Sequence, residues 1–143
     1  MMRKSTILRV EDILRDYPKL ERYIAQRIED LKHPVYERDE NVGGGRAENK
    51  RRNPVLDMLI TIDEDERINA LKRQKRAIAE CLDESDQLTQ VLIEDYYFYN
   101  RKRLSLSGVI AEKQLAVSSR TAFRLRHDFI CRLAHKLGMY DPD

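Results

Sequence analysis

The chain of 143 residues has little that turns, cross-links or interrupts a polypeptide: five glycines, four prolines, two cysteines and no tryptophan. The few glycines and prolines, with the scarcity of alternating apolar and polar residues, argue against a β-sheet protein and predict an all-α fold. Cys81 and Cys131 lie far apart and form no CxxC pair, which favours two reduced thiols over a disulfide. Charged residues make up 36% of the chain, so much of each helix must face solvent or a partner.

Long apolar runs are also missing. No segment approaches the roughly 20 apolar residues that cross a bilayer. Residues 1–10 are basic but lack the apolar region of a signal peptide. We therefore expect no membrane partner and a protein that remains in the cytoplasm.

The usual signatures of catalysis and metal binding are absent as well. No Ser-His-Asp or paired-carboxylate motif stands out, and the glycines at 43–45 are not followed by the Gly-Lys-Ser/Thr of a P-loop. His127, Cys131 and His135 follow one helix face, but the outer two would lie about 12 Å apart, too far for one ion. We expect no enzyme, no cofactor and no metal site.

The net charge of +2 hides an uneven distribution. Residues 1–53 carry a net charge of +3, residues 54–95 one of −6 and residues 96–143 one of +5. The basic C-terminal part therefore fits contact with a polyanion. The acidic run Asp63 to Glu66 has two interpretations: carboxylates in a first helical turn meet the helix dipole favourably, or they contact a polymerase or another partner.

The C-terminal part has the pattern of two helices joined by a tight turn. The first helix is predicted from Ser105 to Gln114, with an apolar patch and a small residue for close helix approach at Val109, Ile110 and Ala111. The turn falls at residues 115–117. The second helix begins at Ser118 or Ser119, either of which can cap it, and ends near Gly138.

The second helix has an apolar and a basic side. The apolar side consists of Ala122, Leu125, Phe129, Ile130, Leu133, Ala134 and Leu137. The opposite side carries Arg120, Arg124, His127, Cys131 and His135. Arg126 projects toward the apolar side, where it snorkels, pairs with an acidic residue or contacts phosphate. This layout is typical of a helix-turn-helix; the alternative is a solvated charged face on an ordinary three-helix bundle.

A helix-turn-helix predicts which residues meet DNA. Arg120 and Arg124 lie in the N-terminal part of the second helix, where guanidinium forks can bind guanine O6 and N7. Hydroxyl groups at the same end suit phosphate oxygens. The predicted DNA-binding residues are Ser118, Ser119, Arg120, Thr121, Arg124, His127, Lys113, Arg101, Lys102 and Arg103, the last four as salt-dependent backbone contacts.

The N-terminal third predicts a helical segment, residues 1–35, on a flexible basic linker, residues 36–53. Apolar residues at helical spacing are Val10, Ile13 and Leu14 for a first helix and Leu20, Ile24, Ile28 and Leu31 for a second. Pro18 fits the first turn of that second helix, and Pro34 would end it. The linker is either a plain tether or a DNA-contacting arm through Arg46, Lys50, Arg51 and Arg52.

Residues 54–143 are predicted to form a helical domain. Asn53 and Pro54 mark a helix start, and Asp63 can continue or restart that helix. The apolar side of this helix is Val55, Leu56, Leu59 and Ile60, and Ile68, Leu71, Ile78 and Leu82 follow in a heptad-like pattern interrupted by Lys75. Such a stripe packs against the same chain or forms a dimer seam. A further helix, Gln87 to Tyr99, is capped by Ser85 or Asp86, with core and rim aromatics at 96–99.

Residues 88–137 also resemble a known family. The sequence contains Leu88-x-x-Val91-Leu92-Ile93-x-x-Tyr96-Tyr97-Phe98, Ile110-Ala111-Glu112-Lys113 and Val117-Ser118-Ser119-Arg120-Thr121. It resembles DNA-binding region 4 of bacterial sigma factors, and more closely the phage late-gene transcriptional activators of the RinA and ArpU type. The stretches Gly43-Gly44-Gly45-Arg46 and Asn53-Pro54 are similar to the Gly-rich linker of such activators.

This resemblance implies a sequence-specific regulator of transcription. It would bind double-stranded DNA through a helix-turn-helix at about residues 86–138, activate packaging, morphogenesis or lysis genes of a phage, and meet bacterial RNA polymerase in the host cell. Two other functions stay open, a DNA-packaging component such as a small terminase subunit and a sigma-like module that binds polymerase. A homodimer is also compatible with the sequence.

Overall fold

The computed structural model describes residues 2–33, 53–139 and 141. Over these ranges the chain is helical without a β-strand, which confirms the all-α prediction. In chain order the elements are α1 (Lys4–Asp16), the 3-10 turn η1 (Tyr17–Lys19), α2 (Leu20–Lys32), α3 (Pro54–Glu64), α4 (Glu66–Glu84), α5 (Gln87–Ile93), the π-helical turn η2 (Glu94–Phe98), α6 (Leu106–Lys113) and α7 (Ser119–Lys136). The linker predicted at residues 36–53 lies outside the described residues, except for Asn53.

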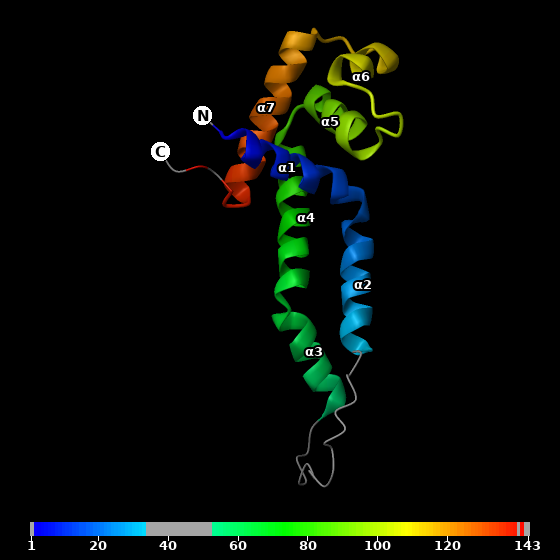
Figure 1. Ribbon diagram of the computed structural model, residues 1–143, viewed down its shortest axis with the longest axis vertical. Helices are drawn as coiled ribbons and strands as arrows, with labels where there is room; N and C mark the ends of the chain where they lie inside the picture. Colours follow the sequence, from blue (N-terminus) through cyan, green and yellow to red (C-terminus); the bar gives the residue numbers. More distant parts are fainter. Residues whose placement is uncertain (1, 34–52, 140, 142–143) are drawn as a thin grey trace.

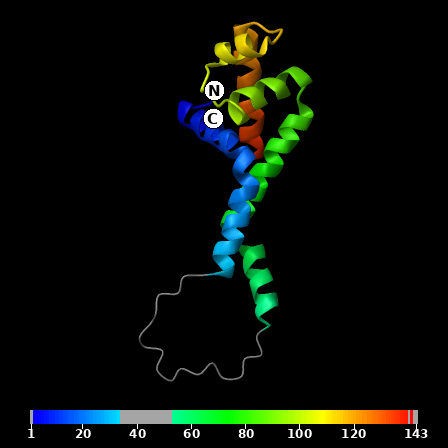
Figure 2. The ribbon, with the colours of Figure 1, turned by 90° about the vertical axis from the view of Figure 1, so that its right-hand side faces the viewer.

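The helices form a head and an arm (Figure 1). The head contains α1, α5, α6, α7 and the C-terminal end of α4, whereas the arm contains α2 beside α3 and the rest of α4, as the view turned by 90° also shows (Figure 2). The two ends of the described chain meet at the head, where the backbone N–H of Arg3 donates to Asp141 Oδ2 at 2.6 Å. The helix-turn-helix elements and α3 therefore lie at opposite ends of the molecule.

The core of the head joins the first helix to the last. Val10 and Leu14 of α1 are fully buried together with Phe129 and Ile130 of α7 and Ile78 of α4. This confirms a first helix around Val10 and Leu14. The predicted division of the chain at residues 35 and 53 stays a prediction, although the described parts on both sides of it share this core.

The second helix starts later than Pro18 alone indicated. Residues Tyr17–Lys19 form one 3-10 turn with Pro18 inside it, and α2 begins at Leu20, which is buried. Proline supplies no N–H, so it is tolerated in a first turn of this kind. The turn changes the chain direction between α1 and α2 (Figure 1).

A break at Asp65 separates α3 from α4, whereas the sequence offered Asp63 as a residue that either continues or restarts the helix. Asp65 ends α3 and caps α4 by accepting the N–H of Ile68 at 2.9 Å. Arg27 of α2 also binds it, with Nη2 at 3.0 Å from Oδ2. This hydrogen bond, followed by the backbone bond, lowers the pKa of the Asp65 carboxyl. A residue of another helix therefore holds the carboxylate at which α3 ends and α4 begins.

The heptad-like side of α4 packs within its own chain. Ile68 and Ile78 are fully buried, Leu71 is buried and Leu82 is partly buried. Lys75, which interrupts the pattern, forms an ion pair with Glu21 of α2 at 2.6 Å. Because α2 and the head cover this side of α4, it is not available as a dimer seam.

The apolar side of α3, in contrast, has no cover among the described residues. Asn53 caps the helix as predicted, accepting the N–H of Val55 and of Leu56. However, no residue of α3 is buried. The exposed apolar residues are Val55, Leu56, Leu59 and Ile60, with 45–69% of each accessible to solvent. The predicted apolar side of this helix is therefore present, but the described part of the chain does not bury it.

The helix predicted at Gln87 to Tyr99 changes character part of the way along. Asp86 is its cap, accepting the N–H of Thr89 at 3.0 Å. From Glu94 the chain widens into a π-helical turn, in which the N–H of Tyr99 donates to the carbonyl of Glu94 at 3.0 Å. Tyr97 is buried and Tyr99 is exposed, which matches the expected core and rim.

Candidate nucleic-acid interface

The helix-turn-helix forms where the sequence predicts it. Ser105 caps α6 by accepting the N–H of Gly108 at 3.1 Å, and Ser118 caps α7 by accepting the N–H of Thr121 at 3.2 Å. Gly138 follows α7 with a φ of 68°, which a residue without a Cβ adopts without strain. Local capping chemistry therefore sets these helix ends.

The turn between the helices depends on a left-handed residue that the sequence did not reveal. Gln114 ends α6 with φ 53° and ψ 45°, a conformation uncommon outside glycine. The N–H of Leu115 then donates to the carbonyl of Ile110 at 3.0 Å. Leu115 and Val117 pack onto a small buried cluster beneath the turn, so apolar contacts hold the turn in place.

That cluster corrects one assignment in α6. Leu92, Leu106 and Ala122 are its buried members, and Val109 is also buried, whereas Ala111 is exposed. At about 100° per residue, Ala111 lies about 140° around the helix from Leu106. It therefore cannot be the small residue at the helix contact.

The two sides of α7 are as predicted. The buried residues are Ala122, Phe129, Ile130, Leu133, Ala134 and Leu137, with Leu125 partly buried. On the other side Ser118, Ser119, Arg120, Arg124 and His127 are exposed, and Thr121 is partly exposed. The predicted base-reading residues thus all reach the surface at the N-terminal half of the helix.

Hydroxyl groups gather where α6 and α7 begin. Ser107 Oγ lies 3.1 Å from Ser119 Oγ, and Ser118 Oγ donates to Thr121 Oγ1 at 3.0 Å. Both helices therefore start next to each other, with exposed hydroxyl side chains at their first turns. This arrangement suits oxygen atoms of a phosphate.

The predicted cations differ in what they already bind. The side chains of Arg101, Arg103, Arg120 and Arg124 form no hydrogen bond or ion pair with any residue that the structure describes. Lys102 Nζ, however, donates to Glu112 Oε1 at 2.8 Å. This bond raises the pKa of Lys102 and lowers that of Glu112. The four arginines are therefore ready to meet an anion, whereas Lys102 would have to leave its partner.

Arg126, which the sequence left open among three roles, pairs with a carboxylate. Its Nη1 lies 3.5 Å from Oε2 of Glu11, a buried residue of α1. Tyr97 Oη donates to the same oxygen at 2.7 Å. Burial, and then this hydrogen bond, raise the pKa of the Tyr97 phenol. The three residues tie α1 and η2 to the underside of α7.

This network could have been found in the sequence. Ile7, Val10, Glu11 and Leu14 follow the i, i+3, i+4, i+7 spacing of a buried stripe, so Glu11 is a carboxylate on an apolar side. Arg126 is a guanidinium on the apolar side of another helix. Two opposite charges in such positions predict a buried pair, because neither is stable there alone.

On α7, Cys131 Sγ lies 3.5 Å from His127 Nε2. Within the described ranges, no three histidine, cysteine, aspartate or glutamate side chains are grouped to hold a metal ion. Of the helices in residues 2–33 and 53–139, none has the length and apolar character that crossing a membrane requires.

Two comparisons extend the description beyond geometry. The model of the family described as "Protein of unknown function (DUF722)" matches residues 7–135, from α1 almost to the end of α7. The "Transcriptional activator rinA" of Staphylococcus phage phi11 is 29% identical over 140 residues, which cover 96% of this chain and 94% of that protein. No solved structure matches. The chain therefore belongs to the DUF722 family and is a homologue of a phage transcriptional activator.

Proposed function

We propose that this protein is a sequence-specific DNA-binding regulator of transcription that places the N-terminal half of α7 in the major groove. One observation carries the proposal. Arg120 and Arg124 are exposed and form no ion pair with a described residue, and they lie at the start of α7, which Ser118 caps. Guanidinium forks in this position can read guanine edges. The relationship to a phage transcriptional activator supports the same function.

The other residues fall into positioning roles. Ser118, Ser119 and Thr121 hold phosphate oxygens at the start of the helix, and His127 lies one turn beyond Arg124 on the same side. Arg101, Arg103 and Lys113 add backbone contacts, as does Lys102 once it releases Glu112. These contacts orient the protein without reading sequence.

We further propose that the regulated genes are late genes of a phage, for packaging, morphogenesis or lysis, and that the protein acts in the cytoplasm of a bacterial host. The support is the match to the phage phi11 activator over nearly the whole length of both chains. Contact with bacterial RNA polymerase would complete such activation, and no catalytic step is needed.

We assign the exposed side of α3 to a homodimer. Burying a half-exposed aliphatic side chain in an interface contributes about 1 kcal/mol to the free energy of association. The eight side chains of two copies, Val55, Leu56, Leu59 and Ile60 from each, therefore contribute about 8 kcal/mol. Association itself costs an estimated 4–15 kcal/mol. The dimer would therefore be weak in free protein and stronger on a DNA site with two halves. A two-fold axis along the molecule would keep both helix-turn-helix elements at one end.

Selection from a library of random duplexes tests the function directly. The purified protein is incubated with the library, bound DNA is recovered over several rounds, and the recovered sequences are compared with those selected by Arg120→Ala/Arg124→Ala. We expect one enriched motif for the wild type and loss of that motif for the variant. Binding without an enriched motif would favour a packaging role, and polymerase capture without DNA binding would favour a polymerase-binding module; either result contradicts the proposal.

A further inference from the structure

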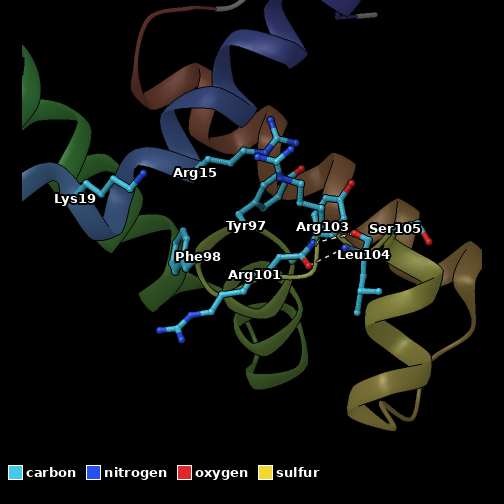
Figure 3. A pocket seen from close by; sticks show the side chains of 10 residues that line it. Arg15, Lys19, Tyr97, Phe98, Arg101, Arg103, Leu104 and Ser105 are labelled. Carbon is cyan, nitrogen blue, oxygen red and sulfur yellow. Dashed lines mark hydrogen bonds between the residues drawn. The ribbon is translucent and has the colours of Figure 1, made fainter.

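A hollow of about 780 Å³ opens between α1, η1, η2 and the loop before α6 (Figure 3). Its lining residues are Arg15, Lys19, Tyr96, Tyr97, Phe98, Asn100, Arg101, Arg103, Leu104 and Ser105. Four of these are cationic and none is acidic, although the whole chain has 25 acidic residues. Two segments far apart in the sequence thus contribute positive charge to one concave surface.

Three of the four cations around the hollow have no acidic partner among the described residues. The side chains of Lys19, Arg101 and Arg103 have no ion pair with any described residue. Arg15 pairs with carboxylates of its own helix, Asp12 at 3.5 Å and Glu11 at 3.8 Å, and its guanidinium carbon lies 5.6 Å from the centre of the Tyr97 ring. Figure 3 shows Arg15 and Arg103 pointing toward one another beside Tyr97. Two guanidinium groups repel at close range, so an anion between them would be favoured.

The loop holds Arg103 in place. Its φ is 52°, a left-handed conformation that costs free energy for a residue with a side chain. Asn100 stabilises this loop, because its Nδ2 donates to the carbonyl of Leu104 at 2.8 Å and its Oδ1 accepts the N–H of Leu104 at 2.9 Å. Arg103 therefore leaves the loop in a set direction.

The hollow reaches the cap of the first helix of the helix-turn-helix. Ser105 lines it and also caps α6. Two residues further on, Ser107 Oγ contacts Ser119 Oγ, in the first residue of α7, at 3.1 Å. Between Lys19 and the start of the proposed recognition helix, neither the lining of the hollow nor the Ser107–Ser119 contact includes an acidic side chain.

We infer that this hollow binds backbone phosphates of DNA flanking the sequence read by α7, so that Arg15 and Lys19 belong to the DNA interface. The inference rests on the proposed function. Duplex DNA presents one negative charge per ~1.7 Å of its axis, and guanidinium forks bind phosphate through two parallel hydrogen bonds. An acidic protein segment could bind the same cations, but only DNA that α7 also contacts accounts for the position of the hollow beside the helix-turn-helix.

Affinity for duplexes of different length tests the inference. The test variant is Arg15→Gln/Lys19→Gln, which removes the two cations of the hollow that the proposed function does not already use. The control is Lys72→Gln/Arg73→Gln, which removes two exposed α4 cations that have no ion pair with a described residue. Each protein is titrated by fluorescence anisotropy against the selected site, once with minimal ends and once with a helical turn of extra base pairs on each side.

We expect the test variant to bind the extended duplex about tenfold more weakly than the wild type, and the minimal duplex equally well. The salt slope is the slope of the logarithm of the binding constant against the logarithm of the salt concentration. On the extended duplex, its magnitude should fall by about 0.9 for each phosphate that the variant no longer neutralises. The control should match the wild type throughout, and the melting temperatures of all three proteins should agree.

Equal affinity of the test variant and the wild type on both duplexes would overturn the inference. So would an equal loss on both, or a loss confined to polymerase binding. These outcomes differ from failure of the proposed function, which would appear as a wild-type protein that does not distinguish the selected site from a scrambled duplex.

Discussion

The start of α7 and the helix α3 expose opposite kinds of side chain. Around the start of α7 the surface carries arginine and hydroxyl side chains and one exposed aromatic residue, Phe123, whereas α3 buries no residue and exposes four aliphatic side chains. The two regions lie at opposite ends of the molecule (Figure 1). One end is therefore suited to a polyanion and the other to an apolar surface.

The clearest test of this contrast makes the same substitution, leucine to alanine, in α7 and in α3. Leu133→Ala, in the fully buried core of α7, should lower the free energy of unfolding by about 3–4 kcal/mol through reduced burial and a cavity. Leu59→Ala, at a position 58% exposed, should lower it by less than about 0.5 kcal/mol in the monomer. Urea denaturation at low protein concentration measures both. Similar losses would mean that α3 is part of the folding core.

The network beneath α7 gives the next largest effect. Glu11→Ala removes the acceptor of Tyr97 and the partner of Arg126, and we expect a loss of about 3 kcal/mol in the free energy of unfolding. Asp12→Ala is the matched control, because Asp12 is exposed on the same helix. Chemical denaturation of both variants is the measurement. An effect of Glu11→Ala no larger than that of Asp12→Ala would show that the network does not join α1 to α7.

A charge on α3 should change assembly and little else. Leu56→Lys/Leu59→Lys should shift sedimentation of the concentrated protein toward the monomer, because two ammonium groups from each copy would have to be buried in the interface. Its melting temperature as a monomer should stay close to that of the wild type. A wild-type protein that remains monomeric at high concentration and on a two-half DNA site would refute the dimer assignment.

The smallest effect concerns pH and the break between α3 and α4. The hydrogen bond from Arg27 is the main cause of the lowered pKa of Asp65. The charged carboxylate therefore stabilises the fold fully above the ordinary carboxyl pKa of about 3.9. This stabilisation is lost as the pH falls through the lower pKa of the folded state. Asp65→Asn keeps a capping side chain but no charge. Its melting temperature should therefore fall less than that of the wild type between pH 7 and pH 3. Parallel curves would show that the Asp65 charge does not stabilise the break.

The sequence predicted the helix-turn-helix well because its boundaries depend on neighbouring residues. Ser105 and Ser118 each accept the N–H of the residue three positions further on, and Gly138 adopts the left-handed conformation that follows the end of α7. The predicted stripe on α7 is buried for a similar reason, since helical spacing places those side chains on one side. Whether the predicted site residues bind DNA stays a prediction.

Features that depend on distant contacts could not be predicted in this way. The sequence offers acidic residues at 63–66 as ends of α3, and the pairing of Arg27 with Asp65 depends on how α2 packs. Helical spacing identified the apolar side of α3, but spacing does not say whether another surface covers it. The basic hollow brings Arg15 and Lys19 to a loop near residue 103, and only the packing of α1 against η2 reveals that proximity.

The proposed function depends above all on Arg124 reading a base, and a specificity profile measures that role. The selected duplex is changed one base pair at a time, and anisotropy gives the affinity of the wild type, Arg124→Ala and Lys102→Ala for each duplex. Arg124→Ala should lose about 1–3 kcal/mol on the selected site and lose preference at one position, whereas Lys102→Ala should weaken every duplex alike and reduce the salt slope. An equal loss for Arg124→Ala on every duplex would show that Arg124 does not read sequence.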